Sequence, residues 1–180
     1  MPDRHGYTTT MDARDSITGS LAKCYITTQE GNRYNFMQAL SLKATLSLKT
    51  VSVPILGKVS KEDKVIGWEG KGSAKFHYNT ALVRNMLETF NNTYAMPEFT
   101  IQVQNEDPGS SVGIQTVILE GCQLKGDVLL TQFDTETEHL TEEIEFSFKN
   151  WRCPQKFKDL NGALEGISKS GDSVTPLTSI

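Results

Sequence analysis

The chain has 180 residues, a length typical of one domain with short extensions. Hydrophobic residues make up 37% and charged residues 22%, a composition that excludes a wholly disordered protein. The formal net charge of −4 argues against a strongly basic protein that grips DNA. No apolar run approaches the ~20 residues of a membrane span and no signal-peptide core follows the N-terminus, so we expect no membrane anchoring.

Residues 1–20 are polar and rich in Thr, Asp, Arg and Ser, which predicts an N-terminal arm that is flexible or ordered by a partner. Residues 23–28 carry β-branched and aromatic side chains and are predicted to form a strand. A turn signal at 30–32 allows residues 33–37 to return as the second strand of a hairpin.

The strongest periodicity lies between residues 40 and 49, where apolar and polar side chains alternate with a period of two. Leu40, Leu42, Ala44, Leu46 and Leu48 occupy one face, and Ser41, Lys43, Thr45, Ser47 and Lys49 the other. The phase shifts at Thr50, which predicts a bulge or the end of the strand. Residues 57–67 are predicted to form a long charged loop between glycines.

Residues 68–78 are predicted to form another two-faced strand, with His77 on its polar face. A helix is predicted next, capped by Asn79 and Thr80 and ending near Asn91. Its apolar stripe consists of Leu82, Val83, Met86, Leu87 and Phe90. Strands are then expected at 99–103 and 114–119.

Residues 123–133 and 140–149 are predicted to pair as one long hairpin joined by an acidic turn. Seven acidic residues and no Lys or Arg lie between Gly126 and Phe148. Either this charge keeps a hairpin soluble, or it forms a surface that repels a polyanion such as DNA. A short helix around 155–164 and a polar tail are expected after it.

About seven strands and one helix indicate a mainly β fold: a β-sandwich or partly open barrel with one packed α-helix and long hairpins. We divide the chain into an N-terminal arm (1–20), a β domain (21–154) and a C-terminal extension (155–180). Several strands have a polar face, which lies either on the solvent side of a sandwich or along a water-filled bore shared by several subunits.

The sequence contains no motif for catalysis, a cofactor or a metal site. Three scattered cysteines, Cys24, Cys122 and Cys153, form neither a disulfide framework nor a metal-binding pair. His77 lacks a readable nucleophile or orienting acid, so a hydrolase is disfavoured. A monomeric β-barrel that binds a small ligand is the alternative function, but serine and lysine on the second strand faces argue against an apolar pocket.

The order of the segments resembles the tail tube protein family of contractile (myovirus-type) phages and phage-like particles, and its PBSX-type (XkdM-like) branch in particular. The segments that carry the resemblance are VSVPILG at 51–57, GKGSAKFHY at 70–78, TVILEGCQL at 116–124, EEIEFSF at 142–148 and WRCP at 151–154. The resemblance covers roughly residues 20–160.

The resemblance implies a structural subunit. Six copies would form hexameric rings with a continuous inner β-barrel, and stacked rings would form a tube inside a contractile sheath. The tube would conduct DNA or a tape measure protein, or puncture a target cell in a bacteriocin-like particle. The implied partners are other copies of the chain, the sheath protein, and baseplate or initiator and terminator proteins. The implied location is the phage tail, after assembly in the bacterial host cytoplasm.

The resemblance also implies two sets of site residues. The segment 51–65 would form the loop that reaches the next ring, and the polar strand faces would line the lumen. The inter-ring set is Val51, Val53, Ile55, Leu56, Lys58, Lys61 and Lys64. The lumen set is Lys43, Thr45, Lys71, Ser73, Asp127, Thr131, Glu143 and Glu145, accompanied by Ser41, Ser47, Lys75 and Ser147.

Overall fold

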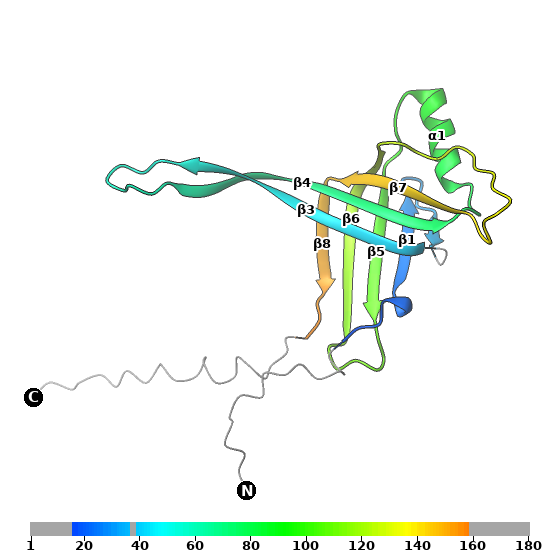
Figure 1. Ribbon diagram of the computed structural model, residues 1–180, viewed down its shortest axis with the longest axis horizontal. Helices are drawn as coiled ribbons and strands as arrows, with labels where there is room; N and C mark the ends of the chain where they lie inside the picture. The colour runs from blue at the N-terminus through cyan, green and yellow to red at the C-terminus, as the bar shows by residue number, and fades with distance from the viewer. Residues whose placement is uncertain (1–15, 37–38, 159–180) are drawn as a thin grey trace, which may run out of the picture.

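A computed structural model describes residues 16–36 and 39–158 as eight antiparallel strands, one α-helix and a 3-10 turn (Figure 1). The elements are η2 (Gly19–Leu21), β1 (Lys23–Thr28), β2 (Arg33–Asn35), β3 (Ala39–Val53), β4 (Glu62–His77), α1 (Leu82–Thr93), β5 (Phe99–Glu106), β6 (Ile114–Lys125), β7 (Thr141–Phe148) and β8 (Asn150–Gln155). The predicted mainly β fold with one helix is therefore confirmed.

The strands follow the order β2-β1-β5-β6-β7-β4-β3, and β8 also pairs with β6. Strand β6 joins two layers, because most of it pairs with β5 and β8 whereas Gln123, Leu124 and Lys125 pair with β7. Figure 1 shows β3, β4 and β7 crossing over β1, β5, β6 and β8. The sheet is therefore folded over itself as an open barrel with a corner in β6.

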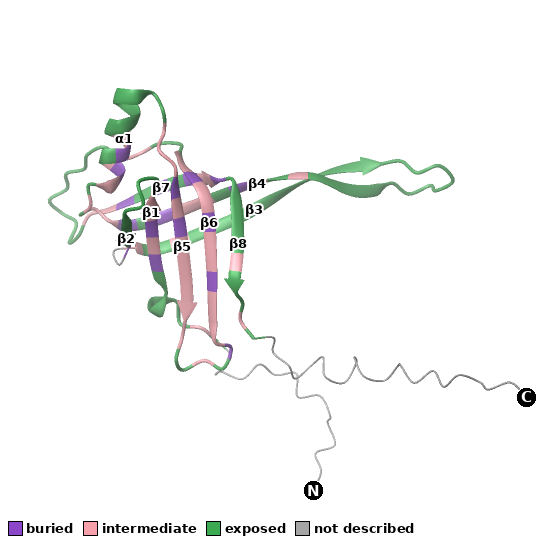
Figure 2. Ribbon diagram, turned by 180° about the vertical axis from the view of Figure 1, so that it is seen from behind, coloured by how far each residue is buried: buried purple, intermediate pink, exposed green. Residues whose placement is uncertain are grey.

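The core fills the space where the two layers cross (Figure 2). The most completely buried large side chains are Phe76, Phe146, Ile101 and Cys122. Strand β4 accommodates both phenylalanine rings of β7, those of Phe146 and Phe148, because glycines lie opposite them. A Cβ atom on Gly72 would lie 2.3 Å from the Phe146 ring, so no larger residue fits without movement.

Helix α1 packs on the end of the barrel through Val83 and Met86, which are buried. The helix begins at Leu82, one or two residues later than a cap at Thr80 or Asn79 predicts. Thr80 rather than Asn79 contributes at its start, where its hydroxyl accepts a hydrogen bond from Leu82 N at 3.3 Å. Phe90 was predicted to belong to the buried stripe, but its side chain is exposed. It lies in the last turns of the helix, beyond the part that packs on the barrel.

Strands β3 and β4 extend past the rest of the sheet as a two-stranded ribbon (Figure 1). We call its outer part, residues 49–66, the arm. The predicted loop at 57–67 was wrong in its second half, because β4 begins at Glu62, which pairs with Val53 of β3. The bulge predicted at Thr50 is confirmed, because the register slips between Lys49 and Thr50; the extra residue lies on β4, so alternation continues along β3.

The long hairpin predicted at 123–149 forms only at its base, where residues 123–125 of β6 pair with residues 145–147 of β7, and its outer part was wrong. Strand β6 ends at Lys125, Gly126 turns the chain with a φ of 71°, and residues 126–140 contain neither helix nor strand. We call this segment the connection. Strand β7 pairs along its whole length with β4 on its other side, where the glycines of β4 accept its phenylalanine rings.

The predicted helix at 155–164 is not seen where the structure can be described. Gln155 ends β8, residues 156–158 have no regular structure, and residues 159–164 lie outside the described residues. Most of the predicted N-terminal arm and C-terminal extension likewise lies outside them.

Candidate assembly surfaces

The polar side chains of β3, β4 and β7 gather on the side of the sheet that faces away from the core. Register pairs Lys43 with Ser73, Thr45 with Lys71, and Ser73 with Glu145. Glu143 lies opposite Lys75 on the same side. We call this surface the polar face. It brings together the predicted lumen residues Lys43, Thr45, Lys71, Ser73, Glu143 and Glu145.

The other two predicted lumen residues do not lie on a strand of that face. Asp127 and Thr131 lie on the connection, where the strand that was expected to carry them is absent. Lys125 at the end of β6 belongs to the polar face although it was not predicted there, because it pairs with Glu145. A predicted strand that ended before Gly126 would have placed Lys125 on the polar face, because Lys125 follows Gln123 by two residues and so shares its side.

Charges of both signs are interleaved on the polar face. Glu69 lies 3.4 Å from Lys125 Nζ and 3.4 Å from Lys71 Nζ. The hydrogen bond from Lys125 and the charge of Lys71 lower the pKa of Glu69, so its carboxylate stays ionised. Lysines outnumber acids on this face: the set is Lys43, Lys71, Lys75 and Lys125 against Glu69, Glu143 and Glu145.

The structure therefore does not gather the acids between 126 and 148 on one surface, as the second of the two alternatives required. The acids are divided among three places. Glu142 is buried against Arg84, Glu143 and Glu145 lie among lysines on the polar face, and the rest lie on the connection. Alternation along β7 explains the division, because Glu142 points to the opposite side of the sheet from Glu143 and Glu145.

The ribbon of β3 and β4 leaves apolar side chains uncovered on its core side. Leu46, Leu48 and Trp68 are exposed there, with Leu48 58% accessible. Strand β3 is also an edge strand, because within the described residues it pairs only with β4. An exposed edge beside an apolar face is typical of a surface that a partner covers.

The arm exposes further apolar side chains on its other side. Val51 and Val53 follow Lys49 by alternation along β3, so they continue the side of the polar face. Val65 pairs with Thr50 and is exposed on the core side, and Leu56 and Val59 at the tip are fully accessible. Every predicted inter-ring residue from Val51 to Lys64 lies on this arm.

A buried ion pair fixes the connection to helix α1. The Glu142 side chain is only 1% exposed, and Arg84 Nη1 donates to its Oε1 at 3.0 Å. Arg84 also donates to the carbonyls of Leu129 and Leu130, and its guanidinium lies 4.4 Å from the centre of the Tyr78 ring. Sequence analysis missed this cluster, because Arg84 lies outside the apolar stripe of the helix and its partner Glu142 is far away in the sequence.

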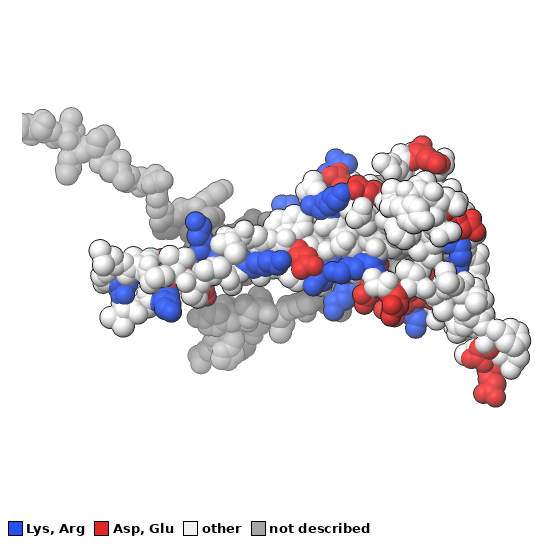
Figure 3. All heavy atoms as spheres, turned by 90° about the horizontal axis from the view of Figure 1, so that it is seen from above, with Lys and Arg blue, Asp and Glu red and all other residues white. Residues whose placement is uncertain are grey.

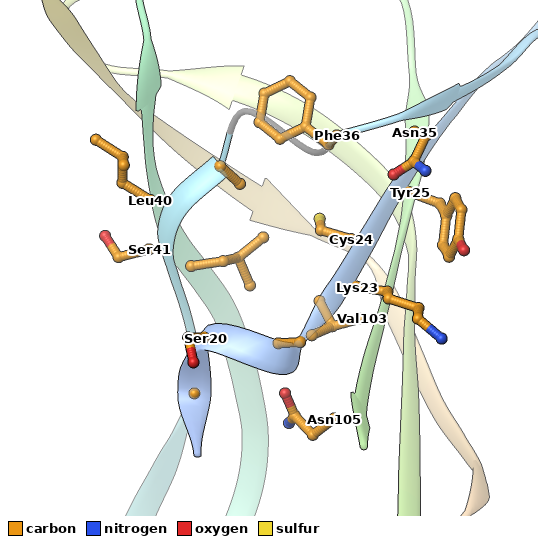
Figure 4. Close-up of a pocket in the computed structure, with 14 residues that line it drawn as sticks. Ser20, Lys23, Cys24, Tyr25, Asn35, Phe36, Leu40, Ser41, Val103 and Asn105 are labelled. Carbon is orange, nitrogen blue, oxygen red and sulfur yellow. The ribbon is translucent and has the colours of Figure 1, made fainter. Parts of the chain in front are cut away.

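A hollow between η2, β1 and the start of β3 offers no chemistry of its own (Figure 4). It has a volume of about 660 Å³. Polar side chains such as Lys23 and Asn105 line it beside apolar ones such as Phe36 and Val103, so it is not a closed apolar ligand pocket. Burial raises the pKa of the Cys24 thiol in its wall to about 11, which keeps that thiol protonated and unreactive.

The candidate catalytic histidine has no catalytic surroundings. The His77 ring packs edge-on against His139 with 5.5 Å between centroids. Among residues 16–36 and 39–158 no three His, Cys, Asp or Glu side chains come together as metal ligands. No helix in the same part of the chain is long and apolar enough to cross a bilayer.

A polar sheet face, a free edge strand and an apolar arm define a structural subunit that assembles with other subunits. The family model described as "Phage tail tube protein" matches residues 9–155, and the chain belongs to that family. It is a structural subunit of a phage-type tail tube and not an enzyme.

Individual relatives agree with this assignment. The chain is 23% identical over 149 residues to "Phage-like element PBSX protein XkdM" of Bacillus subtilis (strain 168), which covers 83% of this chain and 97% of that protein. The fold is similar to a chain of the "Extracellular Contractile Injection System, PVC sheath-tube complex in extended state", with a TM-score of 0.57, 8% identity, and coverage of 78% and 92% of the two chains. A chain of the anti-feeding prophage baseplate matches with a TM-score of 0.53, 10% identity, and coverage of 73% and 91%.

Proposed function

We propose that six copies of this subunit close into a ring whose polar faces line a continuous inner β-barrel, and that the rings stack into a tube inside a contractile sheath. The observation that carries this proposal is the polar face itself, which is continuous across three strands and bounded by an edge strand. A face of this kind needs water on one side, and the bore of a tube supplies it.

Ring closure follows from the two ends of this layer. Strand β3 has a free outer edge. At the other end, β6 pairs with β7 only near Glu145, Phe146 and Ser147, so the edge of Thr141–Ile144 is free as well among the described strands. Backbone hydrogen bonds between β3 of one copy and β7 of the next would extend the sheet without interruption.

The arm is proposed to join one ring to the next. Its apolar residues Val51, Val53, Ile55 and Leu56 supply area for another subunit to bury, and its Lys58, Lys61 and Lys64 can pair with acids on that subunit. The lumen would conduct DNA or a tape measure protein, and sheath, baseplate or initiator and terminator proteins would be the other partners. Assembly would take place in the bacterial host cytoplasm.

Removing the arm tip tests the stacking step. Val53 and Glu62 lie directly opposite each other, so an Asn-Gly turn can replace residues 54–61 without changing the register. The variant should keep the circular dichroism spectrum of the parent protein and form single rings but no tubes in negative-stain microscopy. Lys156→Ser, an exposed change away from the arm, is the matched control and should form tubes.

The ring proposal itself has a separate test in the unmodified protein. At high concentration, or with a nucleating baseplate, it should yield sixfold rings and tubes. A protein that remains monomeric under all these conditions would contradict the proposal. Tubes built by the arm-tip variant would contradict only the role given to the arm.

A further inference from the structure

The arm tip and the connection lie at opposite ends of the long axis of the molecule (Figure 1). Figure 3 shows basic side chains along the arm and a group of acidic side chains at the far end. We propose that the arm tip of one copy docks on the connection of a second copy, in a head-to-tail contact. This inference rests on the proposed function and names the surface that receives the arm.

The arm tip has the features of an inserting element. Leu56 and Val59 are fully exposed, so their apolar area is available to a partner. Lys58 already pairs with Glu62 within the arm. Lys61 and Lys64, by contrast, form no ion pair with any residue that the structure describes. The tip therefore offers two apolar side chains in a segment, residues 56–64, whose three lysines outnumber its two acids, Glu62 and Asp63.

The connection offers the complementary features. Its Phe133 is 90% exposed and its Leu130 is 67% exposed, which is unusual for large apolar side chains on a free subunit. The connection contains four acidic residues and no Lys or Arg, and Asp134, Glu136 and Glu138 follow Phe133 directly. Apolar contact and opposite charge therefore coincide in the same short segment at each end of the molecule.

The receiving surface is held in place before docking. Arg84 and the Tyr78 hydroxyl both donate to the carbonyl oxygen of Leu130, the latter at 3.3 Å. The packing of His139 against His77 secures the other end of the connection. Because these contacts fix the backbone around Phe133, a partner binds it with a smaller loss of conformational entropy.

A second copy of this chain is the occupant that fits. One chain cannot make the contact with itself, since the two surfaces lie at opposite ends (Figure 1). Two copies that use different patches form a heterologous contact, and repetition of such a contact generates a ring or an open stack. In the proposed ring the strands of the polar face run along the bore, so an arm that continues two of them would leave the ring toward the next one.

Cysteine cross-linking between two singly substituted proteins tests the contact directly. Val59→Cys and Phe133→Cys are prepared separately in a Cys153→Ser background, which leaves only the buried Cys24 and Cys122. When the two proteins are mixed and oxidised, the mixed dimer should dominate over either homodimer. Absence of the mixed dimer, or a dominant Val59→Cys homodimer, would overturn the proposal.

Charge exchange provides an independent test. Lys58→Glu/Lys61→Glu/Lys64→Glu and Asp134→Lys/Glu136→Lys/Glu138→Lys should each raise the concentration needed for stacking by ~tenfold or more. The chain that carries all six changes should stack nearly as well as the parent. Lys156→Glu/Lys158→Glu is the control for added negative charge and should have little effect.

The outcomes separate this proposal from the proposed function. If the parent forms tubes but neither cross-link nor charge rescue is seen, the arm is received elsewhere and the tube function stands. If the mixed cross-link forms but microscopy finds no ring or tube, the head-to-tail contact stands and the tube proposal fails.

Discussion

At the scale of the residue, Gly72 shows how a small side chain allows two strands to pack. The Phe146 ring occupies the space where a Cβ atom of residue 72 would lie. Gly72→Ala should therefore lower the free energy of unfolding by about 1–3 kcal/mol, because the ring must move within a filled core. Urea unfolding measures the change.

Gly67→Ala is the matched control, because it belongs to the same strand and no atom lies within 4 Å of the place that its Cβ would take. It should be neutral or slightly stabilising, since alanine restricts the unfolded chain. Equal destabilisation by the two substitutions would contradict the packing argument.

The cysteines make a second prediction at this scale. Burial raises the pKa of Cys24 to about 11 and that of Cys122 to about 12, above the ordinary value of 9.0. The unfolded chain therefore loses thiol protons first as the pH rises, so the stability of the fold should fall between about pH 9 and pH 12. Thermal unfolding across this range, compared with Cys122→Ala, measures the effect.

A thiol-specific reagent at neutral pH checks the same burial. In the native protein it should modify Cys153, which is partly exposed, well before Cys24 or Cys122. All three should react after unfolding in urea. Modification of Cys122 at the rate of Cys153 in the native state would be inconsistent with its buried position.

At the scale of the element, the pair of Arg84 and Glu142 ties helix α1 to strand β7 and to the connection. Arg84→Met should cost about 3–5 kcal/mol, because it leaves the buried Glu142 carboxylate without its partner. Arg84→Met/Glu142→Leu should recover much of that loss, since the uncompensated charge is gone. Chemical denaturation of the two variants measures both effects.

The double variant also tests whether the buried charge alone accounts for the loss of stability. It removes the hydrogen bonds that Arg84 makes to the carbonyls of Leu129 and Leu130. If the pair acts only through its buried charge, the double variant would be as stable as the parent. A double variant less stable than Arg84→Met alone would contradict the assignment of the loss to an unpaired carboxylate.

The elements with a self-contained pattern could be predicted from the sequence. The alternation between Leu40 and Lys49 identified β3, and the phase change at Thr50 located the register shift. The 3.6-residue spacing identified α1 to within a few residues at each end. In each case one segment carries the whole signal.

The features that the sequence did not reveal depend on distant partners. The pairing of β7 with β6 was predicted because they are neighbours in the chain, but its longer pairing with β4, whose glycines accept the ring of Phe146, was not. The place of Glu142 follows from Arg84 on another element. Six of the eight predicted lumen residues share a face because of alternation, whereas Asp127 and Thr131 lie on no strand because β6 ends at Lys125.

At the scale of the whole molecule, the barrel and the arm should differ in local stability. Residues 62–69 of β4 pair with β3 alone, whereas residues 70–77 also pair with β7. Arm amides should therefore exchange hydrogen much faster than those of Ile101 or Phe146 in the free subunit. Hydrogen exchange measured by mass spectrometry checks this difference.

Assembly should largely remove this difference in hydrogen exchange between arm and barrel. In stacked tubes the arm amides should become protected to a degree approaching that of the barrel, because a partner then covers both sides of the ribbon. The arm-tip variant provides the control, since its rings should not stack. Arm amides equally protected in free subunits and tubes would contradict a role for the arm in assembly.

The isolated ribbon has a consequence for how a tube would begin. Ordering a segment costs roughly 1–2 kcal/mol per residue in backbone entropy, so one arm docking on one free copy gains little. A complete ring presents several receiving surfaces at once, and the later arms dock at a high effective concentration. Growth would then show a lag in free solution that a preformed ring removes. The subunit could accumulate unassembled, and the number of tubes would be determined by the number of templates.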